Sequence, residues 1–271
     1  MIQTSLIISV YKNTAFLKAV LDSIAYQTVK PTEIIISEDG DDCQMKAFVE
    51  QYKSATPIRH LSQEDIGWRK NQALNKAIRS ATYEYLIFID GDCVLHPRFI
   101  EHHIILADNK NILAGKRVKL GDHFSDRLKN SNVKKFSQDF LHEYRSIKKD
   151  GGKFCEEGIS IPLNGFTKQI IKFLGISSIK GCNFSCYKSA LEDINGFDED
   201  YIRPAIGEDI DLVWRFKGLG YKITSVKHFC IQYHLNHKES WTDQSENEKM
   251  MHQKMKNKTF RCINGLKQTE Q

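Results

Sequence analysis

The sequence predicts an α/β fold with a doubly wound, mostly parallel β-sheet and a C-terminal helical extension. Three runs dominated by apolar residues, at 6–10, 33–37 and 85–89, predict strands. Runs of this kind are typical of strands buried on both faces of a parallel sheet. Segments with helical spacing of apolar residues separate the strands, and this alternation favours right-handed crossovers within one sheet.

The other elements of the first half follow from spacing and from turn residues. A helix is expected from about Thr14, with Asn13 as its cap. A weaker strand is expected at residues 58–61. After an irregular stretch, a helix should carry the apolar residues between 73 and 78 and lead into the strand at 85–89, which has the strongest strand signal of the chain.

The second half is less regular. Residues 112–118 are expected to form one strand, and the lysine-rich residues 116–153 are either a solvated helical insertion or a surface that meets an anionic acceptor or lipid headgroups. A helix is expected over 209–218 and a strand over 222–226. From Trp241 onward, the tail predicts an amphipathic helix and a disordered end.

Composition excludes several classes of protein. A net charge of +5 over 271 residues is too mild for nucleic-acid binding. The seven cysteines are odd in number and scattered, which indicates reduced thiols in a cytoplasmic protein. The first apolar run is too short for a signal peptide, and no run approaches the roughly 18 residues of a membrane span.

Polar residues follow three of the predicted strands: Tyr11, Asp39, and the pair Asp90 and Asp92. Ligands of open α/β sheets bind beyond the carboxyl ends of the strands, so these groups should converge on one edge. Two carboxylates at i and i+2 can share a divalent cation, because Mg²⁺ and Mn²⁺ favour oxygen ligands. Substrate phosphates commonly supply the remaining ligands of such a site. An ordinary Asp-Gly turn is the alternative.

The second half adds two pairs of candidates. His234 and His237 are three positions apart and can place both imidazoles on one side of a turn, as Mn²⁺ ligands or simply as two surface histidines. Glu208 and Asp209 open a predicted helix. They are either acids favoured at a helix N-terminus or a general base that takes the proton of an attacking hydroxyl.

Two further candidates lie in the first half. The segment Gly67–Asn71 carries the basic side chains of Arg69 and Lys70 near a helix start, where they can clamp a diphosphate or simply be solvated. Asp39 can accept a hydrogen bond from a nucleobase N–H, or it is an ordinary turn aspartate.

The order of these motifs carries a family resemblance. The first four are Ser9–Asn13, Ser37–Gly40, Gly67–Asn75 and Phe88–Asp92. In that order they resemble the family 2 glycosyltransferases, which have the GT-A fold. The next three are Gly181–Ser185, Asn195–Glu199 and Gly207–Leu212. These resemble the C-terminal half of galactosyl- and N-acetylgalactosaminyltransferases, as in chondroitin-polymerase-type modules, so that the likeness covers roughly residues 4–110 and 178–238.

The resemblance implies a donor site at matched positions. Tyr11 and Asp39 would line the pocket of the nucleotide base. Arg69 would lie near the base or the diphosphate. Asp90 would face the ribose or the donor sugar, and Asn183 would also sit near that sugar.

It also implies the metal and catalytic residues. Asp92 would bind Mn²⁺ or Mg²⁺ together with His237, and His234 would be a further ligand. Asp209 would be the catalytic base, and Glu208 would hold hydroxyls of the donor or acceptor sugar.

The division that follows is a GT-A domain over residues 1–240 and an extension over 241–271. Residues 1–110 would bind the nucleotide, and residues 111–240 would bind the acceptor and carry the catalytic base. One departure concerns the stretch before Gly-Glu-Asp, where β-1,4-galactosyltransferases place tryptophans against the acceptor. Arg203–Ile206 occupies that stretch here.

The expected activity is a metal-dependent, inverting transfer of a galactose-, N-acetylgalactosamine- or glucose-type sugar from a UDP-sugar to a glycan or lipid-linked acceptor. The expected setting is the synthesis of a surface polysaccharide such as lipopolysaccharide or capsule, in the cytoplasm with peripheral contact at the inner face of the membrane. Two alternatives are a non-catalytic nucleotide-sugar or carbohydrate-binding module and a sugar nucleotidyltransferase. The latter should carry a glycine-rich basic N-terminal loop, which this chain lacks.

Overall fold

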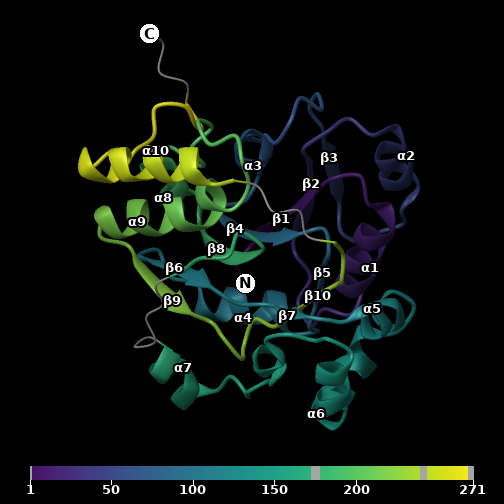
Figure 1. Cartoon of the computed structure of the whole chain (residues 1–271). Helices are drawn as coiled ribbons and strands as arrows, with labels where there is room; N and C mark the ends of the chain where they lie inside the picture. Colours follow the sequence, from purple (N-terminus) through teal and green to yellow (C-terminus); the bar gives the residue numbers. More distant parts are fainter. Residues whose placement is uncertain (1, 172–177, 239–242, 268–271) are drawn as a thin grey trace.

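The computed structural model describes residues 2–171, 178–238 and 243–267. A seven-stranded sheet lies at its centre, with helices on both faces (Figure 1). Across the sheet the strands are β3 (Ile58–Leu61), β2 (Glu33–Glu38), β1 (Thr4–Val10), β4 (Tyr85–Asp90), β8 (Asn183–Tyr187), β6 (Asn111–Ala114) and β9 (Lys222–Ser225). Only β8 runs antiparallel to its neighbours, which confirms the doubly wound, mostly parallel sheet.

Strand β1 shows why the apolar runs are continuous. All seven of its residues are buried. Leu6 and Ile8 pack into the cluster on one face of the sheet, whereas Ile7 packs into the cluster on the other face. Successive side chains of a strand point to opposite faces, so a strand covered on both faces can carry apolar residues at consecutive positions, as Leu6, Ile7 and Ile8 do here.

The first half contains α1 (Thr14–Ile24), α2 (Cys43–Gln51), α3 (Lys70–Ser80) and α4 (Phe99–Leu106). Helix α1 begins at Thr14 as expected, and α3 carries the apolar residues expected between 73 and 78. Asn13 caps α1 as expected, because its side-chain oxygen accepts a hydrogen bond from the Phe16 N–H at 3.0 Å.

A second sheet of three short strands lies beside the main one, in the order β5 (Cys93–Leu95), β10 (Gln232–His234), β7 (Val118–Lys119). The single strand expected over 112–118 is therefore wrong: β6 and β7 belong to different sheets. The chain leaves the main sheet at Gly115, whose N–H donates to the Asn183 carbonyl at 2.9 Å. A Cβ at Gly115 would lie 2.3 Å from the Asn183 amide nitrogen, so only glycine fits at this crossing.

The lysine-rich segment forms α5 (Asp122–Lys129) and α6 (Val133–Lys149), followed by a 3₁₀ turn, η1 (Cys155–Gly158), and by α7 (Gly165–Ile171). The segment is helical as expected, but it is not only a solvated surface. Phe136 and Phe140 of α6 are buried against Tyr233, with ring centroids 5.0 and 5.6 Å away. The insertion therefore packs against β10 and supports it. What its lysines meet stays a prediction.

The helix expected over 209–218 has a different start. A π-helical turn, η2 (Ile206–Ile210), precedes α9 (Asp211–Gly218), and β9 then follows as expected. Helix α8 (Lys188–Asp193) comes directly after β8, and α10 (Ser245–Lys256) confirms the helix expected in the tail. Figure 1 shows α10 beside α9, where Met251 packs against Ile206.

After α10 the tail packs against the domain as far as Lys267, and the disordered end expected for it stays a prediction. The Asn195 side chain donates to the Cys262 carbonyl at 2.9 Å and accepts from the Lys267 N–H at 2.8 Å, which holds the tail against the domain. Residues 268–271 lie outside the described residues. None of the helices in the described ranges combines the length and apolarity of a membrane span.

Candidate active site

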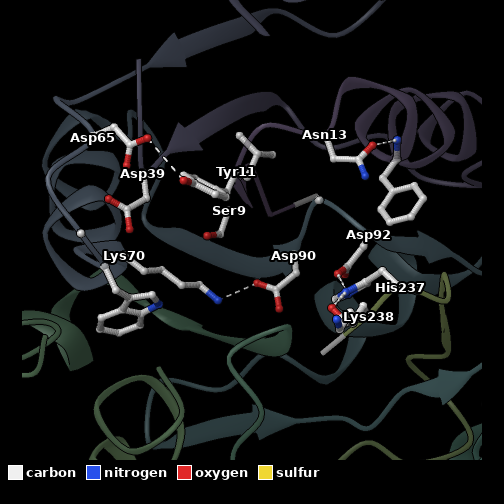
Figure 2. Close-up of a pocket in the computed structure, with 15 residues that line it drawn as sticks. Ser9, Tyr11, Asn13, Asp39, Asp65, Lys70, Asp90, Asp92, His237 and Lys238 are labelled. Atoms are coloured by element: carbon white, nitrogen blue, oxygen red, sulfur yellow. Dashed lines mark hydrogen bonds and ion pairs between the residues drawn. The ribbon is translucent and has the colours of Figure 1, made fainter. Parts of the chain in front are cut away.

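An open cavity of about 640 Å³ lies at the carboxyl ends of β1, β2 and β4 (Figure 2). We call it the main cavity. Its lining residues are Ser9, Val10, Tyr11, Asn13, Phe16, Asp39, Asp65, Gly67, Trp68, Lys70, Asp90, Gly91, Asp92, His237 and Lys238. The polar groups expected at the strand ends therefore share one cavity, as the topology of a parallel sheet requires.

One end of the cavity is aromatic and acidic. Tyr11 is 55% exposed, and its hydroxyl donates to Asp65 at 3.3 Å. Asp39 is buried, and its two carboxylate oxygens accept hydrogen bonds from the Gln63 amide at 2.7 Å and from the Arg69 backbone N–H at 2.8 Å. The ring and the carboxylate are thus fixed in place, and this end can take a flat polar ring such as a nucleobase.

The turn between β4 and β5 depends on Gly91. Its N–H donates to the Ser9 carbonyl at 2.8 Å, and a Cβ at this position would lie 2.7 Å from the Val10 side chain. Any other residue would push the turn away from β1. The glycine therefore sets the positions of Asp90 and Asp92 relative to that strand.

Lys70 joins the two halves of the chain at the floor of the cavity. Its ammonium nitrogen lies 2.8 Å from Asp90 and 2.5 Å from Glu208 (Figure 2 shows the first pair). Burial opposes its charge, yet the two carboxylates hold the pKa of Lys70 well above its usual value. The sequence predicted only a general role for Lys70 beside Arg69. Its position at the start of a helix was a signal that it could face the strand ends, because Lys70 is the first residue of α3.

The carboxylates around Lys70 differ in pKa. Burial raises the pKa of Asp90 to about 6. The carboxylates of Asp92 and Glu208 add to the rise, and Lys70 opposes it. Burial acts in the same direction on Glu208, but Lys70 outweighs it and lowers the pKa of that group. The cluster is therefore an anionic floor with one buried cation.

A group of three side chains that can hold a metal forms the other end of the cavity. The Asp92 carboxylate lies 3.0 Å from the His237 Nε2 and 3.3 Å from the His234 Nε2. One ligand atom from each of the three lies within 4.8 Å of the others. His234 is buried on β10, opposite Cys93 of β5, whereas His237 is exposed and follows the strand.

The protonation states of this triad suit a divalent cation. Burial lowers the pKa of His234 to about 4, so its imidazole is neutral at pH 7 and keeps a lone pair. Burial alone would raise the pKa of Asp92, but the hydrogen bond with His237 and the proximity of His234 lower it to about 2. One carboxylate with two imidazoles is a donor set that fits Mn²⁺.

Asp209 lies beside Glu208 on η2, and neither residue lines the main cavity directly. Its carboxylate accepts from the Gly181 N–H at 2.6 Å and from the Lys180 ammonium at 3.0 Å. Just before the turn, Ala205 has φ 80°, a conformation that costs about 1–3 kcal/mol in a non-glycine residue. Its N–H donates to Glu208 at 3.2 Å, which helps to fix that carboxylate.

Two expected donor residues are placed elsewhere. The Arg69 guanidinium donates to the Glu64 carbonyl and is not part of the main cavity; only its backbone N–H reaches Asp39. Asn183 is fully buried, and its amide donates to the Lys116 and Cys230 carbonyls at 2.7 and 2.9 Å. The Asn183 side chain therefore has a structural role, because its donors are used inside the protein, and its expected place near the donor sugar stays a prediction.

A buried network holds η2 in place. Asp211 accepts from the Arg215 Nε at 2.6 Å and from the Tyr201 hydroxyl at 3.0 Å, and Arg215 donates to the Ile194 and Gly196 carbonyls, each at 2.9 Å. Asp211 and Arg215 have no exposed surface. Sequence reasoning missed this pair, although its i, i+4 spacing on a predicted helix was a signal.

Comparison with known families agrees with this arrangement. The family described as Glycosyl transferase family 2 matches residues 5–194, well over half of the chain. The family described as the N-terminal domain of galactosyltransferase matches residues 163–238. Together they confirm the two-part resemblance found in the sequence.

Individual relatives are distant. Validoxylamine A glucosyltransferase of Streptomyces hygroscopicus subsp. limoneus is 26% identical over 231 residues, covering 81% of this chain and 49% of that protein. Chondroitin synthase of Escherichia coli is 27% identical over 116 residues, covering 42% of this chain and 17% of that protein. The chain thus spans at most about half the length of these relatives.

Two solved structures share the fold. Mannosyltransferase PcManGT from Pyrobaculum calidifontis, in complex with GDP-Man and Mn²⁺, aligns with a TM-score of 0.58 at 16% identity, over 88% of this chain and 58% of that one. S. aureus TarS 1–349 in complex with UDP aligns with a TM-score of 0.55 at 16% identity, over 86% and 60%. At these identities the likeness shows the fold alone, which is of the GT-A type.

Proposed function

Because the chain belongs to glycosyl transferase family 2, we propose that it is a metal-dependent, inverting glycosyltransferase that uses a UDP-sugar. The observation that carries this proposal is the convergence of Asp92, His234 and His237 at one end of a cavity whose other end is lined by Tyr11 and Asp39. A nucleoside diphosphate sugar has a base at one end and a diphosphate at the other. The Mn²⁺ and UDP bound by two proteins of the same fold support the proposal.

The protein's own residues have distinct tasks in this reaction. Tyr11 and Asp39 hold the base, and Lys70 keeps Asp90 and Glu208 at fixed positions near the sugar. A divalent cation held by Asp92 and the two histidines supplies positive charge that stabilises the departing diphosphate.

The chemical step is a single displacement. An acceptor hydroxyl attacks the anomeric carbon, the bond from that carbon to the diphosphate oxygen breaks, and UDP leaves. The Asp209 carboxylate takes the hydroxyl proton, which contributes about 10²–10⁴ in rate. Gly181 and Lys180 position Asp209 through their hydrogen bonds. Attack from the face opposite the leaving group inverts the anomeric centre.

The donor sugar is of the galactose, N-acetylgalactosamine or glucose type, and the acceptor is a glycan or a lipid-linked saccharide of a surface polysaccharide such as lipopolysaccharide or capsule. The galactosyltransferase match over residues 163–238 supports the sugar class. We place the enzyme in the cytoplasm, with peripheral contact at the inner face of the membrane. The lysine-rich α6 supports such a contact through charge.

A donor screen tests the proposal. The chain is incubated with UDP-glucose, UDP-galactose and UDP-N-acetylgalactosamine in the presence of Mn²⁺, and the released products are measured. We expect UDP release from at least one donor and none after addition of EDTA. Release of pyrophosphate would instead indicate a nucleotidyltransferase. Binding of the donors without turnover would indicate a non-catalytic module.

A matched pair of variants links the turnover to the metal site. Asp92→Asn should abolish the Mn²⁺-dependent release, because it removes the charged ligand of the triad. Asp126→Asn alters a surface carboxylate paired with Lys129 and should leave the release unchanged.

A further inference from the structure

A second cavity of about 260 Å³ lies next to the main one. Its lining residues are Trp68, Arg69, Asn71, Gln72, Glu199, Asp200, Tyr201, Ile202 and Asn264. Trp68 lines both cavities, so its indole is the wall that they share. Of the residues expected to bind the donor or the metal or to act as the base, only Arg69 lines this second cavity. Its guanidinium donates to the Glu64 carbonyl and is not part of the main cavity.

The second cavity lies next to the turn that carries the proposed catalytic carboxylates. Asn71 and Tyr201 line it and also press against Gly207, where a Cβ would lie 2.5 Å from the Tyr201 Cβ and 2.9 Å from the Asn71 amide nitrogen. Glu208 is the next residue along the chain. A molecule in this cavity would therefore lie close to the η2 turn.

The lining combines one flat aromatic wall with several hydrogen-bonding groups. Trp68 is partly exposed, and within the described residues its indole N–H has no hydrogen-bonded protein partner. The Gln72 amide also has none in the described part of the chain. Across from them, Asp200 is held by Lys254 at 2.6 Å and by Asn264 at 2.7 Å, so its carboxylate is fixed.

This chemistry matches a sugar ring. A pyranose has an apolar C–H face, which suits the flat face of an indole, and a rim of hydroxyls, which suits amide and carboxylate groups. Ile202, which is 62% exposed, adds an apolar surface at the edge. A purely apolar ligand would cut the Gln72 amide off from water without offering it a partner, which is costly.

We propose that the second cavity binds a pyranose unit of the acceptor, with Trp68 as the platform that separates acceptor from donor. This inference rests on the proposed function, since it assumes that the main cavity holds a nucleotide-sugar. The acceptor sugar then stacks on one side of the indole, and Gln72 binds one of its hydroxyls. Trp68 and Gln72 are positioning residues, because neither touches the bond that breaks.

The test is binding of two defined probes, p-nitrophenyl β-D-glucopyranoside and p-nitrophenyl β-D-galactopyranoside, to the full chain in the presence of UDP and Mn²⁺. Saturation-transfer NMR titration gives the affinity. Trp68→Ala should weaken binding of the tighter probe at least tenfold, and Trp68→Phe should restore part of it because an aromatic face remains. Gln72→Ala should weaken it about 2- to 10-fold, the effect of one lost hydrogen bond.

Gln44→Ala is the control, because Gln44 is another helical glutamine, is exposed and lines neither cavity. It should bind the probes as the wild type does. The affinity of each variant for UDP, measured in the same samples, reports whether the main cavity is intact.

The outcomes separate the two proposals. If neither probe binds the wild type, or if Trp68→Ala and Gln72→Ala bind as tightly as Gln44→Ala, the acceptor cavity is overturned. If the probes bind as expected but no UDP-sugar is turned over by the wild type, the proposed function fails while the sugar-binding cavity stands.

Discussion

The first and second halves of the chain contribute to one site by different means. In the first half, Tyr11 and Asp39 directly follow β1 and β2, and Asp90 is the last residue of β4. These three strands are adjacent, parallel and in register. Their backbone hydrogen bonds alone place the three side chains at one edge of the sheet.

In the second half, no long strand positions the functional groups. Glu208 and Asp209 lie on a five-residue π-helical turn, and His237 follows a three-residue strand. These segments are held by buried side chains, such as the pair of Asp211 and Arg215 under η2. The difference teaches that the proposed nucleotide end of the site is fixed by the sheet, whereas the proposed metal and base end depends on individual side-chain contacts.

The largest effect should come from the base end. We expect Asp209→Asn to lower turnover about 10²–10⁴-fold, because the amide cannot take the proton of the acceptor hydroxyl. Affinity for UDP and the melting temperature should stay near the wild-type values. Steady-state kinetics with the preferred donor measures the loss. Near-normal turnover would remove Asp209 as the base and leave the second half without its proposed catalytic group.

The buried pair tests whether side-chain contacts hold the second half. Arg215→Met leaves the Asp211 carboxylate buried without its cation, so we expect the free energy of unfolding to fall by about 3–5 kcal/mol. Chemical denaturation measures it. The double variant with Asp211→Asn should lose less than the sum of the two single variants. Additive losses would show that the pair does not act as a unit.

The metal end gives a smaller effect. His237→Ala removes one of three ligands, and we expect the affinity for Mn²⁺ in the presence of UDP to fall at least about tenfold. Calorimetric titration measures it. His142→Ala, at an exposed histidine of α6, is the control and should bind Mn²⁺ as the wild type does. Equal affinity in both variants would contradict the role of His237.

The smallest effect is expected at Asn183, where a loss of stability can be distinguished from a loss of donor binding. Asn183→Ala leaves the Lys116 and Cys230 carbonyls without their donors, so we expect a loss of about 1–3 kcal/mol of stability. The KM for the donor should not change. A raised KM with unchanged stability would restore the donor contact first expected for this residue.

Much of the first half could be predicted from the sequence because its signals are local. A strand such as β4 can be recognised from consecutive apolar residues, and the acids at its end then indicate the edge of the sheet where a ligand binds. The strand expected over 112–118 failed for the opposite reason. Both of its parts contain apolar residues suited to a strand, and it is the buried amide of Asn183, almost seventy residues away, that forces the chain out of the sheet at Gly115.

By itself, the sequence determined the strands of a doubly wound sheet, the acids at their ends and the family to which their order belongs. Only the tertiary structure decided that Lys70 bridges Asp90 and Glu208, that His234 is buried beside Asp92, and that Trp68 stands between two cavities. The physical reason is range. Hydrophobic period and turn chemistry act over a few residues, whereas each of these contacts depends on how distant segments pack.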